Sequence, residues 1–206
     1  MIITFGRQYG SGGREISAML ADRLHVAYYD DLLLKEAAKE SGLCEELFHS
    51  FDEQPQSMLF SIAMDPYSLF GGQFSPSGTF EQQVYLATYS TIQKLAEQGP
   101  CILVGRCADY ALKDRTDVLN IFITAPLKNR IARVAARNGI SESEAKDRIK
   151  RMDKSRAAYY NFYSSKDWGE AKSYDLCIDS SLLGIEGTVD FLMKLLDMKH
   201  LIKKEK

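Results

Sequence analysis

Short apolar runs alternate with amphipathic stretches along this chain of 206 residues. Runs rich in β-branched and aromatic residues, which favour strands, begin at residue 2 and cover 26–30, 101–106, 119–125 and 174–179. Apolar residues recur at helical spacing over 15–24, 32–41, 80–98, 127–137, 140–155 and 185–198. Strands that alternate with helices predict an α/β fold in which a five-stranded parallel sheet is covered by helices on both faces.

The first connection from a strand to a helix carries three glycines, Gly10, Gly12 and Gly13. Glycines let the backbone adopt positive φ and direct consecutive N–H groups to one point before a helix, which favours phosphate binding. In the standard phosphate loop G-x-x-x-x-G-K-[ST], Gly12 can be the second glycine, but Gly13 then takes the lysine position and Arg14 the hydroxyl position. A tight turn without a ligand is the alternative, although the glycines together with Arg7 and Arg14 exceed what a turn requires.

Charged residues follow two other predicted strands. Ligands of open parallel sheets gather at the carboxyl ends of strands, so Asp30 could orient a substrate or a metal-bound water. Its neighbour Asp31 is better explained as the N-cap of the helix that begins near Leu32. Gly105 and Arg106 end the third apolar run, where glycine lets the backbone approach a ligand that the arginine can then reach.

Two neighbouring helices carry most of the remaining cations. Arg130, Arg133 and Arg137 recur at i, i+3 and i+7 in the first helix, and a capping box from Ser141 and Glu144 begins the second. The second helix and its end carry Arg148, Lys150, Arg151, Asp153, Lys154 and Arg156. Because a charge run on a helix can be merely a solvated surface, that explanation stays open for Arg137, Arg148 and Lys150.

Two segments have less regular patterns. Residues 45–79 are interrupted by proline and glycine yet rich in Phe, Met and Leu, so we expect an irregular or helical insert that folds over a ligand site. An aromatic stretch follows the cationic helices and comprises Tyr159, Tyr160, Phe162, Tyr163 and Trp168. These rings could stack on a base, but packing of the chain's return to the sheet is the commoner role.

Composition limits the possible functions. A net charge of −2 gives no sign of a surface that binds nucleic acid polymers or membranes, so any positive field must be local. The four cysteines, Cys44, Cys101, Cys107 and Cys177, lack metal-ligand spacing and fit reduced core positions. No run approaches the ~20 apolar residues of a membrane span, and a strand at residue 2 leaves no secretory leader. We therefore expect a cytoplasmic protein of one domain, with no pattern that predicts its oligomeric state.

Several ordered motifs together resemble the cytidylate kinase-like family, a branch of the P-loop kinases that includes nucleoside monophosphate kinases. The residues that carry the resemblance lie at 7–15, 28–30, 104–109 and 153–160, with Trp168 and 174–175 behind them. The resemblance implies a P-loop kinase core over 1–31, 80–126 and 172–198, a monophosphate-binding insert over 32–79, and a helical lid over 127–171. It also implies transfer of the ATP γ-phosphoryl group to a nucleoside monophosphate such as CMP or dCMP, with Mg²⁺.

The resemblance assigns roles to individual residues. The donor phosphates would be bound by Arg7, Gly10, Ser11, Gly12, Gly13, Arg14 and Glu15, and the acceptor by Asp30, Gly105, Arg106 and Asp109. The catalytic group would comprise Arg14, Arg130, Arg133, Arg151 and Arg156, with Asp153 as an acceptor-side or arginine-orienting carboxylate. The family's loop has a lysine followed by a hydroxyl that holds Mg²⁺; without them, the candidate metal ligands here are Ser11, Glu15 and Asp30.

Other functions remain open at this point. Arg14 could replace the charge of the missing lysine, but arginine is longer and planar, so the exchange is not conservative. The chain could therefore be a non-catalytic nucleotide- or anion-binding module, or a kinase for another small phosphorylated acceptor. Binding to a nucleic acid polymer is disfavoured, because the chain is slightly acidic and its basic residues cluster in one segment.

Overall fold

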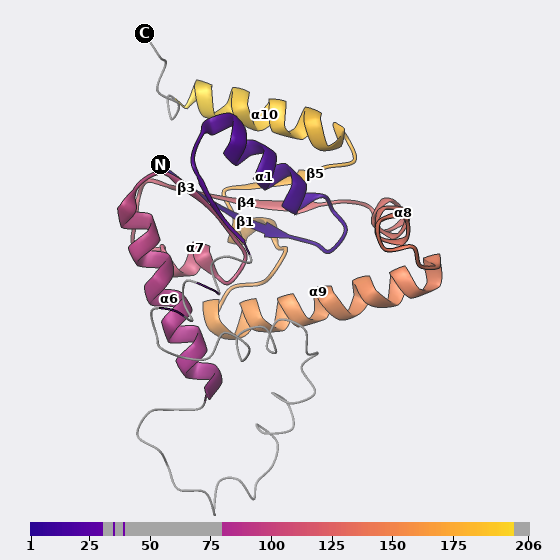
Figure 1. The fold of residues 1–206 in the computed structure, drawn as a ribbon, viewed down its shortest axis with the longest axis horizontal. Coiled ribbons are helices and arrows are strands. Elements are labelled where there is room, and N and C mark those ends of the chain that lie inside the picture. Colours follow the sequence, from indigo (N-terminus) through magenta and orange to yellow (C-terminus); the bar gives the residue numbers. More distant parts are fainter. Residues whose placement is uncertain (31–34, 36–38, 40–79, 200–206) are drawn as a thin grey trace, which may run out of the picture.

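A five-stranded, all-parallel sheet lies at the centre of the chain (Figure 1). The computed structural model describes residues 1–30, 35, 39 and 80–199. Its strands are β1 (Ile2–Arg7), β2 (Ala27–Tyr29), β3 (Cys101–Val104), β4 (Val118–Thr124) and β5 (Leu176–Asp179). Their spatial order is β2-β3-β1-β4-β5. The predicted α/β class and parallel sheet are confirmed.

Helices connect these strands, and their labels follow Figure 1. They are α1 (Gly13–Leu24), α6 (Phe80–Gln98), α7 (Ala108–Ala111), α8 (Leu127–Asn138), α9 (Glu142–Ser164) and α10 (Gly184–Met198), with a 3₁₀ turn at Ala171–Ser173. Of the helix predicted over 32–41, only Lys35 and Lys39 are described, and both are helical. The predicted insert over 45–79 lies outside the described residues. No described helix has both the length and the apolar content to cross a bilayer.

Both faces of the sheet are buried, which explains why the strands are continuous apolar runs rather than alternating ones. Ile3 and Phe5 of β1 pack in one core cluster with residues of α1 and α10. Ile2, on the opposite face of β1, packs in a second cluster with residues of α6 and α7. The alternation along β1 therefore fixes which helices cover which face.

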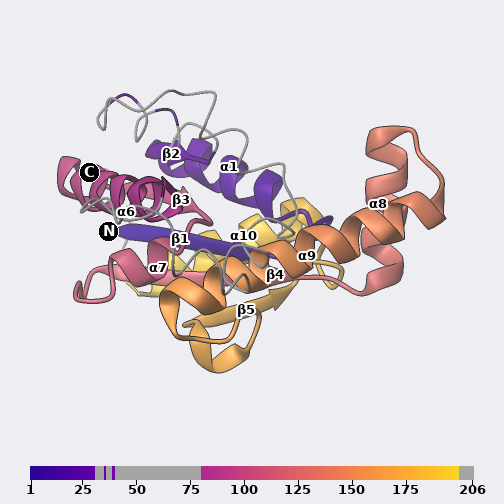
Figure 2. The ribbon, with the colours of Figure 1, turned by 90° about the horizontal axis from the view of Figure 1, so that it is seen from below.

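The carboxyl ends of the strands point toward α8 and α9 (Figure 1). Both views place α9 on the same side of the sheet as α7, and Figure 2, which looks at that side, shows α9 crossing in front of β1 and β4. The loop after β1, the turn after β3 and helix α9 consequently surround one region at the carboxyl edge, which is where open α/β sheets bind ligands.

Helix α9 extends beyond the predicted end at residue 155. The predicted capping box begins it, since the side chains of Ser141 and Glu144 each bond the other's backbone N–H group. The helix then continues through the tyrosine and phenylalanine residues of the aromatic stretch and ends before Trp168, where Ser165 adopts φ of +55°. Tyr163 stacks on Tyr85 of α6 with ring centroids 3.8 Å apart. The aromatic side chains therefore extend the helix by packing it against its neighbours.

Candidate functional site

A cavity of about 700 Å³ opens at the carboxyl edge of the sheet, beside the glycine loop. Seven arginines and two aspartates line it: Arg7, Arg14, Arg106, Arg137, Arg148, Arg151, Arg156, Asp30 and Asp109. Guanidinium groups bind phosphate and carboxylate oxygens with paired hydrogen bonds. The cavity is therefore suited to a ligand that carries several negative charges.

The loop between β1 and α1 forms one wall of this cavity. Gly10, Gly12 and Gly13 all lie on the wall, and Gly13 is the first residue of α1. Gly10 has φ of +79°, and a Cβ there would lie 2.7 Å from Cγ2 of Val134 in α8. The loop glycine thus permits both an unusual backbone conformation and the close approach of α8.

The three candidate metal ligands have different surroundings. Ser11 is fully buried, and its hydroxyl donates to the Gln8 carbonyl at 2.9 Å. Glu15 is exposed and does not line the cavity. Asp30 lines the cavity, but both its oxygens contact arginines. No cluster of three or more His, Cys, Asp or Glu side chains that could hold a metal ion occurs among the described residues. A magnesium site made by these side chains alone does not fit this arrangement.

Asp30 joins two of the cavity's arginines. Its Oδ1 lies 3.1 Å from Nη2 of Arg7, and its Oδ2 lies 2.9 Å from Nε of Arg14. The Asp30 side chain is 7% exposed, whereas that of Arg14 is 62% exposed. The buried carboxylate therefore holds two guanidinium groups beside the glycine loop, with Arg14 accessible from the solvent.

The turn after β3 has three consecutive residues in the left-handed region. The φ angles are +78° at Gly105, +55° at Arg106 and +54° at Cys107. For a residue other than glycine this conformation costs roughly 1–2 kcal/mol. Such strain persists where the surrounding structure enforces it, which is typical of ligand sites. Here the turn places Arg106 on the cavity wall, and a Cβ on Gly105 would lie 2.1 Å from Nη1 of Arg7.

We predict that replacing Gly105 by alanine weakens ligand binding more than it destabilises the fold. The added Cβ would push the Arg7 guanidinium away from its place beside Asp30, and a flexible side chain can move aside at low cost. Gly139→Ala is the matched control, because Gly139 has φ of +62° but nothing within 4 Å of an added Cβ. We expect both variants to lose about 1–2 kcal/mol of unfolding free energy in urea from backbone strain alone.

Calorimetric titration with ATP separates the two variants. We expect at least a tenfold increase in Kd for Gly105→Ala and an unchanged Kd for Gly139→Ala. Equal ATP affinity in both variants would show that the position of Arg7 against Gly105 does not matter for binding.

The far end of the cavity is aromatic. Asp109 is buried and accepts a hydrogen bond from the Tyr160 hydroxyl at 2.7 Å, and its Oδ2 lies 3.6 Å from Nζ of Lys166. Burial, with added repulsion from the Asp109 carboxylate, raises the pKa of Tyr160, so this hydroxyl remains a donor. Trp168 and Tyr174 also line this end and pack against Phe122 of β4.

One face of α9 spans the cavity from its basic end to its aromatic end. The wall residues Arg148, Arg151, Met152, Ser155, Arg156, Tyr159 and Tyr160 recur three or four positions apart. Arg137, at the end of α8, and Arg148 both lie on the wall, whereas Lys150 is exposed and lies outside it. The sequence alone had left all three open between a ligand site and a solvated surface.

Sequence reasoning missed Tyr9 and Gln8, which belong to the same loop. The Tyr9 ring lies close to two wall arginines, with its centroid 5.4 Å from Cζ of Arg137 and 5.5 Å from Cζ of Arg156. The Gln8 Oε1 accepts hydrogen bonds from the Thr124 hydroxyl at 2.5 Å and the Ala125 N–H at 3.2 Å. The only sequence signal for either residue was its place inside the glycine loop.

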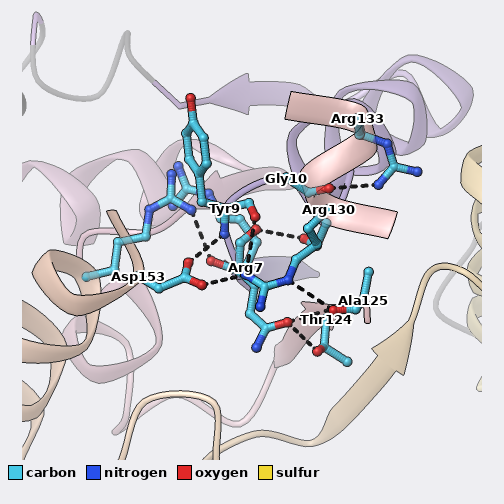
Figure 3. Close-up of polar contacts among 11 residues, drawn as sticks. Arg7, Tyr9, Gly10, Thr124, Ala125, Arg130, Arg133 and Asp153 are labelled. Carbon is cyan, nitrogen blue, oxygen red and sulfur yellow. Dashed lines mark hydrogen bonds and ion pairs between the residues drawn. The ribbon is translucent and has the colours of Figure 1, made fainter. Parts of the chain in front are cut away.

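Three of the predicted catalytic residues do not line the cavity but contact the backbone of the loop (Figure 3). Arg130 donates to the carbonyls of Ala125 and Tyr9, and its Nη1 lies 2.5 Å from Oδ2 of Asp153. Arg133 donates to the Gly10 carbonyl at 2.8 Å. These three side chains therefore hold the loop, while Arg151, Arg156 and Arg14 line the cavity.

A sequence profile of the cytidylate kinase-like family matches residues 2–182. The chain belongs to the cytidylate kinase-like family. A protein of Methanopyrus kandleri named cytidylate kinase is 26% identical over 206 residues, which cover 96% of this chain and 93% of that protein. Membership of the cytidylate kinase-like family, at this low identity to relatives named cytidylate kinase, suggests a kinase without naming its substrate.

Solved structures agree with the family's fold. The crystal structure of an uncharacterised protein from Eubacterium ventriosum has a TM-score of 0.72 at 27% identity, over 96% of this chain and 98% of that one. A shikimate kinase from Bacteroides thetaiotaomicron has a TM-score of 0.55 at 17% identity, again over 96% and 98%. The likeness to that kinase shows the fold alone, and it agrees with a P-loop kinase core in this member of the cytidylate kinase-like family.

Proposed function

We propose that this chain transfers the γ-phosphoryl group of ATP to a nucleoside monophosphate, with CMP and dCMP as the leading acceptors. The observation that carries the proposal is the cavity lined by seven arginines beside the glycine loop and the first turn of α1. Phosphoryl transfer needs in-line positioning and positive charge around the reacting group, and little covalent chemistry from the protein. A cavity rich in arginine supplies that charge in fixed positions.

The two ends of the cavity suit the two substrates. The glycine loop, the N-terminus of α1 and Arg14 would bind the donor phosphates, because backbone N–H groups and a cation converge there. Arg106 would bind the phosphate of the acceptor, and Asp109 would face its nucleoside among the aromatic side chains. Arg7 lies between the loop and the turn after β3, where it can stabilise charge on the transferring group.

Helix α9 has a role in excluding water. Its cavity face runs from Arg148 to Tyr160 and lies opposite the strand ends, so it shields the reacting phosphoryl group from hydrolysis. Magnesium, when it arrives with ATP, neutralises part of the phosphate charge. Since the described side chains form no metal site of their own, they act through binding and orientation of the phosphates.

The decisive experiment is a coupled assay of ADP formation with ATP and Mg²⁺ over a panel of ribo- and deoxynucleoside monophosphates. A reaction without acceptor gives the background of ATP hydrolysis. We expect ADP above this background with CMP, dCMP or both. If no monophosphate raises ADP formation while ATP still binds, nucleoside monophosphate kinase activity is excluded.

A second candidate is a nucleotide- or anion-binding module without turnover. Two observations favour this function. Glycine occupies the lysine position of the loop, and Arg14, the cation that directly follows the loop glycines, is held in an ion pair with Asp30. Tight ATP binding by calorimetry, with no acceptor-dependent ADP from nucleoside monophosphates or other small phosphorylated compounds, would favour this function over the kinase.

A further inference from the structure

The backbone of the phosphate loop is held by side chains from the two lid helices. Arg133 of α8 donates to the Gly10 carbonyl at 2.8 Å, and Arg130 donates to the Tyr9 carbonyl at 3.4 Å. From α9, Asp153 accepts from the Tyr9 N–H at 2.7 Å. A fourth contact comes from Arg156, which donates to the Arg7 carbonyl at 3.1 Å. Four backbone groups, the carbonyls of Arg7, Tyr9 and Gly10 and the Tyr9 N–H, thus bond charged side chains of α8 and α9.

Packing supports the same attachment independently of these hydrogen bonds. A Cβ on Gly10 would lie 3.0 Å from the Arg130 carbonyl oxygen, so the loop lies directly against the backbone of α8. Tyr9 packs against a small apolar cluster of Val134, Ala145 and Ile149, which joins α8 to α9. The loop therefore packs as one unit with the part of α8 around Arg130 and Val134 and the part of α9 around Ala145 and Ile149.

With one exception, the side chains that hold the loop are not the side chains that line the cavity. Arg130 is 8% exposed, and neither it nor Arg133 nor Asp153 lines the cavity. The cavity face of the lid is instead made by Arg137, Arg148, Arg151 and Arg156. Only Arg156 belongs to both groups, because it lines the cavity and also bonds the loop.

We infer that Arg130, Arg133 and Asp153 are positioning residues that fix the phosphate loop from outside. In this chain the loop lacks the lysine and the following hydroxyl that the standard sequence provides, since Gly13 and Arg14 occupy those positions. Side chains of α8 and α9 instead hold the loop through contacts with its backbone. These residues position the loop whatever the loop binds, and only the consequence for phosphate binding rests on the proposed function.

The first test measures hydrogen exchange of the loop amides 8–12 in the free protein by mass spectrometry. The variant Arg133→Ala loses the hydrogen bond to the Gly10 carbonyl. Because the Arg133 side chain is only half-buried, we expect this variant to fold. We expect exchange about fivefold faster in the loop, as for the loss of a hydrogen bond worth ~1 kcal/mol, with unchanged exchange in β4. Lys154→Ala is the matched control, because Lys154 is an exposed cation of α9 outside the cavity, and it should leave the loop unchanged.

Two variants of Asp153 isolate its contact with the loop. Asp153→Asn keeps an oxygen that can accept from the Tyr9 N–H, whereas Asp153→Ala removes it. Both remove the negative charge beside Arg130, so any general loss of stability is shared. We expect loop exchange in Asp153→Ala to exceed that in Asp153→Asn by about fivefold.

Binding of ATP, measured by calorimetry on the same variants, separates positioning from direct contact. We expect the Kd for ATP to rise about tenfold in Arg133→Ala, together with the faster exchange of the free loop. Weaker ATP binding with unchanged exchange would mean that Arg133 contacts the ligand itself and would overturn the inference, as would no change in either. Faster exchange with unchanged ATP affinity would support the positioning of the loop and remove the loop from the proposed phosphate site.

Discussion

Replacing Arg106 or Arg14 by alanine is expected to lower phosphoryl transfer by about 10³-fold, the scale on which a supplied arginine accelerates this chemistry. Both side chains line the cavity, and both lie on its rim rather than in the core. Since phosphoryl transfer depends on charge around the transferring group, the loss should fall mainly on kcat/KM. Steady-state ADP formation with the best acceptor of the panel measures it, and circular dichroism should show the native fold.

The matched control is Arg23→Ala. Arg23 is a partly exposed arginine of α1 that pairs with Asp190 and does not line the cavity. This variant should keep its activity, because a surface ion pair contributes about 0–1 kcal/mol to stability and nothing to the site. Normal turnover of Arg106→Ala or Arg14→Ala would remove that residue from the proposed mechanism.

The sequence predicted the sheet well because its strands are buried on both faces. Such strands are short, continuous apolar runs that are easy to recognise in the sequence. The glycine loop after the first strand then indicated that a site should lie at the carboxyl edge of the sheet. Helix α7 escaped prediction, because its four residues, Ala108–Ala111, are too few to show a helical period. The end of α9 was placed too early, since the aromatic side chains that stabilise it pack against Tyr85 of α6 and against Tyr174, just before β5, and the sequence pattern within α9 shows neither contact.

The location of the cavity was easier to predict from the sequence than the side chains that line it. Periodicity places Arg148, Arg151, Ser155 and Tyr159 on one face of a helix, but it does not say whether that face meets the sheet or the solvent. Likewise, Arg130 and Arg133 have the same side chain as the cavity arginines. Both donate to backbone carbonyls of the loop, and such contacts leave no trace in the sequence.

The pattern of charged residues in the sequence does not show which arginines line the cavity and which hold the loop. The arginine stripe of α8 reads as one feature in the sequence, yet its members have different surroundings in the fold. Arg130 is buried, Arg133 bonds the loop, and Arg137 lies on the cavity wall beside the Tyr9 ring. The stripe lies on one face of α8, and at a rise of about 1.5 Å per residue the seven positions from Arg130 to Arg137 carry it about 10 Å along the helix axis, from the loop to the cavity wall.

The ion pair between Arg130 and Asp153 gives the largest expected effect on stability. Their side chains are 10% and 18% exposed, so removing one partner leaves a poorly solvated charge. We expect Arg130→Met to lower the unfolding free energy by about 3 kcal/mol, the lower end for breaking a buried pair, because Asp153 still has access to some water. Urea denaturation followed by circular dichroism measures this loss.

The double variant Arg130→Met with Asp153→Asn tests the cause. It removes both charges, and the asparagine oxygen can still accept from the Tyr9 N–H. If the unpaired carboxylate causes the loss, the double variant should recover about 2 kcal/mol relative to Arg130→Met alone, because the penalty for a buried lone charge disappears. If the double variant is as unstable as the single one, the unpaired charge of Asp153 is not the cause of the lost stability. The cause is then the loss of the hydrogen bonds from Arg130 to the carbonyls of Ala125 and Tyr9.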